Sequence, residues 1–474
     1  MLKNICLLLL TLLLNKIDAQ KNHDVKLETV QKEPSKGAFW ADEKYSYYSI
    51  FRDVNGKKNS VCAIEKADTS LTRSKVVDLN VVNTADIKGL GDDYKFFYIG
   101  NNFLIVHTVL TRPKTYTYFT LYDWKGVQKA RKEVVDPIGS VSSYEFKMSE
   151  DRNLLLCYTI GFDDSKLHLL VLNQNLDEKC KTSIEIKDII DKHFYDYSIS
   201  NSGNFYCTYS QYVKGKVNYL RLLSVSGNGS VVKEFPLLHD GFPIESSVFK
   251  LKGDDYIYIS GYLARNSKGP TDVLHMSLNG KDFSINYKSC KPLSKEFITK
   301  LTPESVANSN KPKALISIPS FRSIHPKDDG GYIAFRIIDD MIVMTNVSNK
   351  GDEIWSSYIP KGNFLHVGYI HSLDVAYLYA DGKYYILYSD DAHNINVLRR
   401  GETIEFDFQE ACIFLATISE GGEFTREIVY KPQLTREDQR LFFRPTLANS
   451  YIEGQLQIIR ANDPYSQSGY LKVK

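Results

Sequence analysis

The sequence is poor in the patterns that mark metal sites and nucleic-acid binding. Its seven cysteines form no CxxC pair and fall at no zinc-type spacing. Lysine and arginine number 59 against 57 acidic residues, whereas phosphate recognition needs a basic surplus. We therefore predict no metal site, no cofactor and no nucleic-acid partner.

Motifs of several enzyme classes are missing as well. No glycine is followed two residues later by serine, which excludes the G-x-S-x-G elbow of propeller-linked serine hydrolases. The sequence has no HExxH and no P-loop. The sialidase-type turn S-x-D-x-G-x-x-W is not matched, because Trp40, Trp124 and Trp355 all fall elsewhere. We therefore assign no catalytic residue.

Long apolar runs are confined to the N-terminus, MLKNICLLLLTLLLNKIDAQ. One lysine precedes the apolar run Ile5–Leu14 and a short polar segment follows it, which is the pattern of a secretory signal peptide. No later run approaches the roughly 20 residues that a membrane-spanning helix needs. We expect a signal peptide over residues 1–19, a chain of residues 20–474 exported to the periplasm or the extracellular space, and no direct membrane insertion.

What the sequence does contain is an internal repeat. YEFKMSEDRNLLLCYT and YDYSISNSGNFYCTYS share tyrosine, serine and asparagine at an offset of 51 residues. At this same interval, apolar strands are predicted to begin just after a polar turn at Phe103, Leu154, Phe205 and Tyr256. Related starts follow at wider intervals at Tyr332, Tyr384 and Leu456, and a weaker one precedes them at Tyr45. The chain therefore repeats one structural unit about eight times.

Each unit reads as four strands. An alternating strand leads through a turn into a more apolar strand, and a hairpin follows whose turn is marked by glycine or asparagine, as in DWKG, SGNG and NKGD. One such unit cannot bury both faces of its sheet, so the units must stack around an axis, as in a β-propeller. We predict an all-β fold, a single β-propeller domain over residues 20–474 with four-stranded blades.

Eight blades are preferred, and seven blades, with the weak N-terminal unit pairing into the last, are the alternative. The last unit has room for three strands, Phe443–Lys474, so the N-terminal segment VKLETVQ is expected to close it as an outer strand.

The turn before the apolar strand carries a resemblance. ISNSGNFYC, YADGKYYIL and HPKDDGGYIAF resemble the S-x-D-G-x turns of bacterial secreted or periplasmic propellers of the TolB-like and WD40-like kind. The resemblance covers most of residues 20–474, and it implies the propeller architecture far more than an activity.

Two insertions, residues 288–320 and 390–410, interrupt the repeat. In the first, apolar residues recur at helical spacing after Pro292, which predicts a short amphipathic helix. A solvated loop that caps the ring is the simpler interpretation of this segment, and a partner-docking element is the functional one. The candidate partner-binding residues are Lys288, Lys291, Lys295, Phe297, Lys300, Lys311 and Lys313.

The second insertion is acidic, DDAHNINVLRRGETIEFDFQE. Carboxylates at this density could hold calcium, but the EF-hand order D-x-D-x-D-G is absent, so a solvated acidic loop is the preferred interpretation.

Export, a rigid ring, two insertions and no recognisable catalytic motif together predict a function. We expect a non-catalytic scaffold that binds another envelope protein, as a subunit of a bacterial outer-membrane secretion or assembly complex. The alternative is a glycan-binding or glycan-cleaving propeller whose carboxylates converge on the central channel from several blades. Such a site would be invisible in the linear sequence.

Overall fold

The computed structural model describes most of the chain. The described residues are 23–27, 38–41, 46–54, 57–67, 73–80, 92–111, 114–136, 144–160, 166–186, 194, 196–213, 216–229, 232–263, 265, 271–301, 320–338, 341–362, 375–398, 403, 411–431, 442–443, 455–462 and 465–473. Within these ranges the secondary structure is nearly all β, with one α-helix and one 3-10 helix.

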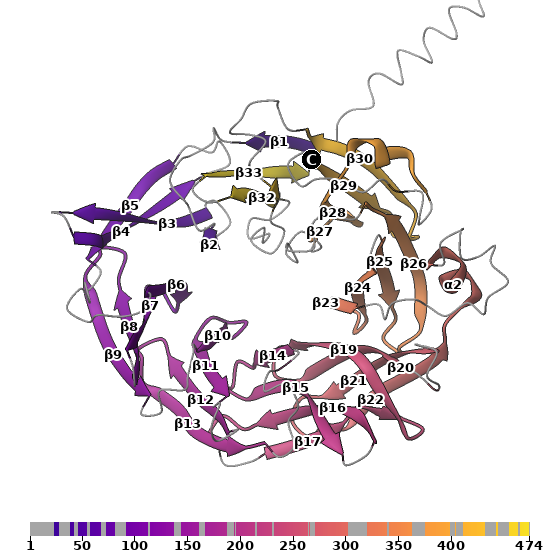
Figure 1. Ribbon diagram of the computed structural model, residues 1–474, viewed down its shortest axis with the longest axis horizontal. Helices are drawn as coiled ribbons and strands as arrows, with labels where there is room; N and C mark the ends of the chain where they lie inside the picture. The colour runs from indigo at the N-terminus through magenta and orange to yellow at the C-terminus, as the bar shows by residue number, and fades with distance from the viewer. Residues whose placement is uncertain are drawn as a thin grey trace, which may run out of the picture.

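Eight antiparallel sheets are arranged around a ring, and one edge strand of each faces the centre (Figure 1). From innermost to outermost strand, the first four sheets are β2 (Ala38–Ala41), β3 (Ser46–Val54), β4 (Lys57–Ala67) and β5 (Arg73–Asn80); β6 (Asp92–Ile99), β7 (Asn102–Thr111), β8 (Lys114–Tyr122) and β9 (Gln128–Asp136); β10 (Glu145–Met148), β11 (Leu154–Ile160), β12 (Lys166–Asn173) and β13 (Glu178–Glu185); and β14 (Asp196–Ile199), β15 (Phe205–Val213), β16 (Lys216–Val225) and β17 (Val232–Pro236).

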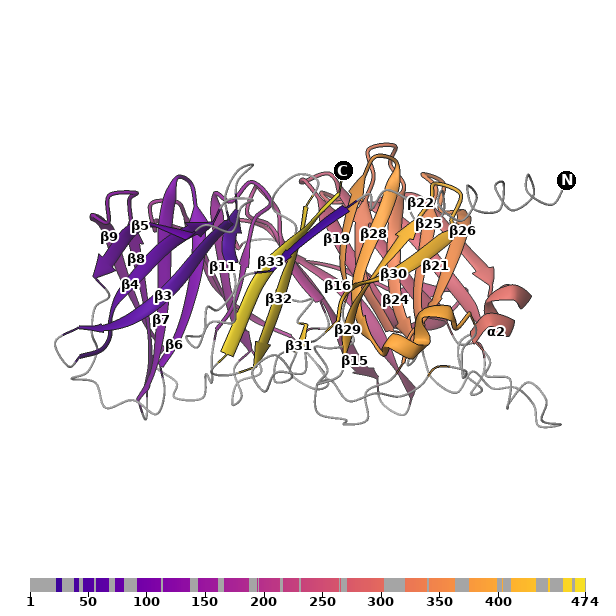
Figure 2. The same cartoon turned by 90° about the horizontal axis from the view of Figure 1, so that it is seen from above.

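The other four sheets are β19 (Phe242–Lys252), β20 (Tyr256–Leu263), β21 (Asp272–Asn279) and β22 (Ile285–Pro292), with the short β18 (Leu238–His239) paired to β19; β23 (Ser320–Pro326), β24 (Tyr332–Ile338), β25 (Met341–Val347) and β26 (Glu353–Pro360); β27 (Ala376–Ala380), β28 (Lys383–Asp390), β29 (Cys412–Ile418) and β30 (Phe424–Tyr430); and β31 (Phe442–Phe443), β32 (Gln455–Asn462), β33 (Tyr465–Val473) and β1 (His23–Leu27). Seen from the edge of the ring, the sheets stand side by side (Figure 2). The predicted propeller of eight blades is confirmed, and we number the blades 1 to 8 in this order.

The 51-residue repeat marks the second strand of each blade. Its starts fall at or within one residue of the beginning of β3, β7, β11, β15, β20, β24, β28 and β32. These strands lie between two neighbours in their sheets, and in blades 2 to 7 nearly all of their described side chains are buried, because both faces pack on adjacent blades. In β11, for example, six of the seven residues are buried.

The turn before this strand is also repeated in its hydrogen bonds. In blade 4, Gly203 N donates to Ser200 O at 3.0 Å, and Gly203 has a φ of 91°. In blade 3, Arg152 N donates to Ser149 O at 3.0 Å with a φ of 58°. A left-handed residue is therefore required at this point, where glycine carries no steric penalty.

Hydrophobic clusters lie between consecutive blades. One joins blades 3 and 4 through side chains such as Leu156, Leu169 and Phe205, and six further clusters join other consecutive pairs of blades among the described residues. Each fully buried Leu or Phe stabilises the fold by about 1.5–3 kcal/mol relative to leaving it exposed. Stacking of blades therefore holds the ring together.

The N-terminal strand closes the last blade, as predicted. Strand β1 pairs antiparallel with β33, with Val25 opposite Leu471, and becomes the outer strand of blade 8. A sheet built from both ends of the described chain fastens the ring and covers an edge that would otherwise be exposed.

The first insertion begins later than its sequence pattern indicates, because β22 runs through Pro292. The predicted helix follows as α2 (Lys295–Leu301). Ser294 caps it, since its Oγ accepts a hydrogen bond from Phe297 N at 3.0 Å. Residues 302–319 lie outside the described residues.

The second insertion departs from the solvated acidic loop that we expected. Asp390 ends β28, is 0% exposed, and accepts hydrogen bonds from Gly362 N, Asp391 N and Asn394 Nδ2. Asp391 caps the 3-10 helix η2 (Ala392–Asn396). These two carboxylates therefore organise the backbone at the end of a strand, and the acids from Glu402 to Glu410 lie outside the described residues.

Six cysteines are described, and all have free thiols. No described helix is long and apolar enough to cross a membrane.

Candidate functional site at the central channel

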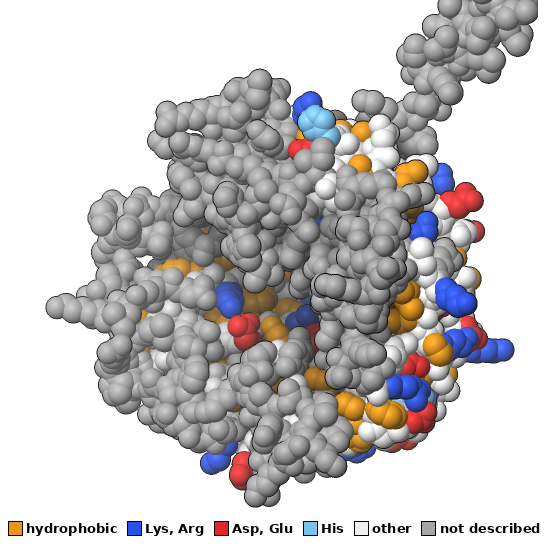
Figure 3. Space-filling model, turned by 45° about the vertical axis from the view of Figure 1, so that its right-hand side comes forward, with side chains coloured by type: hydrophobic (Ala, Val, Ile, Leu, Met, Phe, Trp, Pro, Cys, Tyr) orange, Lys and Arg blue, Asp and Glu red, His pale blue; other side chains and the backbone are white. Residues whose placement is uncertain are grey.

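Five polar side chains from five consecutive blades gather toward the centre of the ring. They are Lys147 on β10, Asp196 on β14, Lys250 on β19, His325 on β23 and Tyr377 on β27, each an innermost strand, and we call them the channel cluster. The space-filling view shows a hollow within the ring in which side chains of both charges are visible beside hydrophobic ones (Figure 3).

Strand register places the members of the channel cluster at nearly one level. Lys147 pairs with Leu156, the third residue of β11, and Lys250 pairs with Tyr258, the third residue of β20. The other three members each pair within one residue of the equivalent point in their own blades, namely Asp196 with Thr208, His325 with Ile333 and Tyr377 with Ile386. The cluster is therefore a polar belt across five blades.

Among the described residues, neither lysine of the belt has a close counter-charge. Neither Lys147 nor Lys250 forms an ion pair or a hydrogen bond with a described residue; Lys147 Nζ lies over the Tyr197 ring, 5.7 Å from its centroid. Lys147 is exposed to solvent by area but surrounded by the wall of the ring. Partial desolvation of its ammonium group by this wall, and the like charge of Lys250, lower the pKa of Lys147.

Asp196 is the carboxylate near both of these lysines, but its two oxygens accept hydrogen bonds from backbone N–H groups. Its Oδ1 accepts from Tyr197 N at 2.9 Å, and its Oδ2 accepts from Phe249 N, on blade 5, at 3.1 Å. Burial raises the pKa of Asp196 to about 6, although these hydrogen bonds and the lysines oppose that rise. Asp196 therefore joins two blades and only partly balances the two lysines.

The far end of the belt is uncharged. His325 Nε2 lies 2.8 Å from Ser323 Oγ, and its Nδ1 hydrogen-bonds the Tyr377 hydroxyl. The His325 and Tyr377 rings lie with their centroids 3.7 Å apart. Burial and the charge of Lys250 lower the pKa of His325 to about 3, so its imidazole is neutral near pH 7.

The candidate partner-binding residues of the first insertion lie elsewhere, at the outer side of blades 5 and 6. Lys288 Nζ donates to Leu238 O at 2.9 Å, and Lys291 pairs with Asp352 at 2.7 Å. Phe297 is 3% exposed in the core between the two blades, whereas Lys295 and Lys300 are exposed on α2. Lys311 and Lys313 lie outside the described residues.

No group of three or more His, Cys, Asp or Glu side chains in the described part of the chain is arranged to hold a metal ion. The channel cluster contains lysines where a cation site would need carboxylates. Its chemistry suits an anion.

The sequence matches no family model and no curated protein. Solved structures resemble the fold at low identity. Prolyl oligopeptidase B from Galerina marginata is 10% identical, with a TM-score of 0.43, covering 96% of this chain and 56% of that one. The β-propeller domain of the Trilobed protease from Pyrococcus furiosus is 8% identical, with a TM-score of 0.37, covering 81% and 94%. The chain thus spans about half the length of the prolyl oligopeptidases that it resembles.

These comparisons contradict the function expected from the sequence. The two solved structures reported above are a prolyl oligopeptidase and the propeller domain of a protease, and neither is an envelope scaffold or a glycan-binding protein. The prediction of a non-catalytic scaffold in an envelope complex, with a glycan-specific propeller as its alternative, is therefore wrong. At these identities and TM-scores the likeness shows the fold alone, so a function must be argued from the residues of this chain.

The channel cluster was not predicted from the sequence, because the innermost strand of each blade was used only to locate the repeated turn that follows it. The signal was present, since Lys147, Lys250 and Tyr377 occupy equivalent positions before their turns. A comparison of that single position across the repeats would have revealed the polar belt.

Proposed function

We propose that this chain is a ligand-binding propeller whose central channel takes a small multivalent anion. The observation that carries this proposal is the pair of lysines, Lys147 and Lys250, that face the channel without an ion pair to any described residue. Two like charges held in one confined space repel each other, and an anion between them would relieve that repulsion.

The rest of the belt supports an anion rather than a cation. Asp196 uses both of its oxygens on backbone N–H groups, and its pKa of about 6 means that it loses its charge in mild acid. His325 and Tyr377 contribute neutral hydrogen-bonding groups beside the lysines. Charged and neutral donors in one confined site are what a carboxylate or phosphate group needs.

Isothermal titration calorimetry at low ionic strength tests the proposal, with citrate and pyrophosphate as probes. The unmodified chain should bind at least one of them, and the double variant Lys147→Gln/Lys250→Gln should bind at least about tenfold more weakly. Lys281→Gln is the matched control, because Lys281 is an exposed lysine paired with Asp255 away from the channel cluster. Failure of both probes to bind, or equal binding by the double variant, would contradict the proposal.

We also propose export of the protein to the periplasm or the extracellular space. Support comes from the sequence pattern of residues 1–19, which lie outside the described residues. Cell fractionation with and without this segment tests the proposal, which fails if both forms stay in the cytoplasm. An envelope protein as partner stays a prediction.

A further inference from the structure

A second site lies between blades 5 and 6, away from the channel cluster. A cavity of about 220 Å³ is bounded by β21 and β22 of blade 5, by the β25–β26 turn of blade 6, and by α2 with the segment that leads into it. At this size it would hold on the order of seven water molecules, below the roughly 300 Å³ at which sites for drug-sized ligands begin. A fitting ligand is therefore small.

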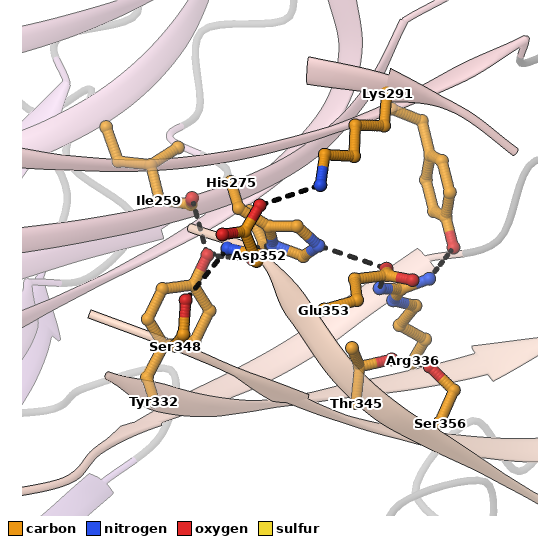
Figure 4. A network of polar contacts seen from close by, with 12 residues as sticks. Ile259, His275, Lys291, Tyr332, Arg336, Thr345, Ser348, Asp352, Glu353 and Ser356 are labelled. Carbon is orange, nitrogen blue, oxygen red and sulfur yellow. Dashed lines mark hydrogen bonds and ion pairs between the residues drawn. The ribbon is translucent and has the colours of Figure 1, made fainter. Parts of the chain in front are cut away.

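The polar end of the cavity is the carboxylate of Glu353, which two buried side chains hold by hydrogen bonds. Glu353 Oε1 accepts from Arg336 Nη2 at 3.0 Å and from His275 Nε2 at 3.1 Å, as Figure 4 shows. Arg336 also donates to Tyr262 OH at 2.9 Å, and His275 Nδ1 lies 2.8 Å from Tyr332 OH. Arg336 is 0% exposed and His275 is 2% exposed, so this support is a built part of the core.

The second oxygen of this carboxylate, Glu353 Oε2, differs from the first in its hydrogen bonding. Glu353 lines the cavity, and no described residue donates a hydrogen bond to its Oε2. Although burial opposes it, the hydrogen bond from His275 and the charge of Arg336 lower the pKa of Glu353 to about 2. Glu353 therefore keeps a charged acceptor toward the cavity at neutral pH.

Lys291 supplies a cationic group at the rim of the cavity. Its Nζ pairs with Asp352 Oδ1 at 2.7 Å, and its side chain is 59% exposed (Figure 4). An ammonium group has three donors, so Lys291 can hold Asp352 and still donate to a ligand. Lysine and arginine balance the two acids, and burial lowers the pKa of His275 toward its neutral form. The site is thus neutral overall but has separated charges.

The remaining wall is apolar and closely fitted. Val273, Leu293 and Phe297 line the cavity, and each is less than 9% exposed. Gly351, which also lines the cavity, has a φ of 85° and lets its turn approach β22 so closely that a Cβ would lie 2.9 Å from the Tyr287 ring. An aliphatic group would bury its surface against this wall.

We propose that this cavity binds a free aliphatic α-amino acid. Its ammonium group donates to Glu353 Oε2, and its carboxylate accepts from Lys291. Its side chain packs against Val273, Leu293 and Phe297. A zwitterion matches the site because it too is neutral overall with separated charges, and a small one suits the volume.

Calorimetric titration of the full chain with leucine and three analogues tests the proposal. Leucine should bind, whereas N-acetylleucine, which lacks the ammonium group, and isoamylamine, which lacks the carboxylate, should each bind at least about tenfold more weakly. Glycine, which lacks the aliphatic side chain, should also bind more weakly. No binding of leucine, or equal binding of leucine and either of the first two analogues, would overturn the proposal.

Variants locate the site and separate it from the channel. Ser289→Leu should fill the cavity and abolish leucine binding, and Lys291→Ala should weaken it about tenfold. Lys300→Ala is the matched control, because Lys300 is an exposed lysine of α2 that does not line the cavity. Circular dichroism establishes that each variant is folded. If leucine bound a folded Ser289→Leu chain and a folded Lys291→Ala chain as tightly as the unmodified one, the cavity would not be its site.

Discussion

Asp196 in the channel and Glu353 in the cavity are two enclosed carboxylates with opposite electrostatic surroundings. Glu353 contacts a fully buried arginine and a buried histidine, and its pKa falls to about 2. Asp196 has two lysines near it but accepts only backbone hydrogen bonds, and its pKa rises to about 6. A direct, hydrogen-bonded counter-charge therefore offsets the effect of burial on a carboxylate pKa, whereas lysines held beyond contact distance do not.

The two sites also differ in whether their charged groups are already paired within the fold. Arg336 and Glu353 pair with each other within the fold, so this pair offers a ligand only the second oxygen of the carboxylate. The channel lysines form no ion pair with a described residue. An anion would therefore be their counter-charge, as Glu353 is the counter-charge of Arg336. We expect loss of Arg336 to lower the free energy of unfolding, and loss of a channel lysine to lower the affinity for an anion.

The largest expected effect is on the free energy of unfolding of a variant that lacks the buried arginine. Arg336→Met should lower it by about 3–5 kcal/mol, because Glu353 would lose its buried partner and Tyr262 its hydrogen-bond donor. Lys250→Met, in the channel, should change it by less than about 1 kcal/mol. Urea denaturation followed by circular dichroism measures both. Equal losses in the two variants would contradict the expectation that Arg336 stabilises the fold more than Lys250 does.

The second effect is the pH dependence of stability, which should have opposite signs at the two carboxylates. Asp196 has a raised pKa, so its contribution is fully present below about pH 4 and is lost as the pH rises through about 6. Glu353 has a lowered pKa, so its contribution is present above about pH 4.5 and is lost as the pH falls toward 2. Each difference is on the order of 3 kcal/mol.

Urea denaturation across this pH range, on Asp196→Asn and Glu353→Gln chains, separates the two contributions. Asp196→Asn should flatten the stability curve between about pH 4 and 6, and Glu353→Gln should flatten it below about pH 4.5. If both variants changed the curve in the same pH range, the assignment of opposite shifts would be wrong.

A smaller effect is expected on anion affinity. Sulfate, whose charge does not change in mild acid, should bind several-fold more tightly at about pH 5 than at about pH 7, because protonation of Asp196 removes the negative charge beside the lysines. The Asp196→Asn chain should show little of this dependence. Calorimetric titration at constant ionic strength measures the ratio. A pH dependence that survives in Asp196→Asn would assign it to another group.

The smallest effect should come from the exposed ion pair at the rim of the cavity. Lys291→Ala should lower the free energy of unfolding by less than about 1 kcal/mol, because Lys291 and Asp352 are both more than half exposed. Urea denaturation measures this change, with Lys300→Ala as the control. A loss above about 2 kcal/mol would mean that Lys291 is part of the fold, and that its effect on leucine affinity cannot be read as direct contact.

Much of the fold could be predicted from the sequence because a propeller blade repeats its physical requirements. The turn before Phe205 must contain a left-handed residue, and the strand that follows must be apolar on both faces, so spacing survives where identity drifts. The closing strand was equally predictable, since the last blade was one strand short. The beginnings of both insertions were misplaced. The polar end of β22, with Lys288 and Lys291, reads as a loop. Asp390, expected in a solvated loop, is buried at the end of β28.

Neither site could be predicted to the same degree. Lys147, Asp196 and Lys250 come from different blades, so no pattern within one repeat indicates that their side chains meet. Only a comparison of the innermost-strand position across the repeats does so. Phe297 was selected as a docking residue from its place in a basic segment, but helix α2 turns it into the core. Glu353 follows a hairpin turn and reads as an ordinary exposed strand residue, because its partner Arg336 lies on another strand.

The central claim is that an anion supplies the counter-charge that the described residues do not give the channel lysines, and it can be measured directly. NMR titration of the Lys147 side chain, on a chain with labelled lysines, reports its pKa with and without saturating citrate. We predict a low pKa without citrate and a rise when citrate is bound, because the anion offsets both desolvation and the charge of Lys250. An ordinary lysine pKa that citrate leaves unchanged would contradict it.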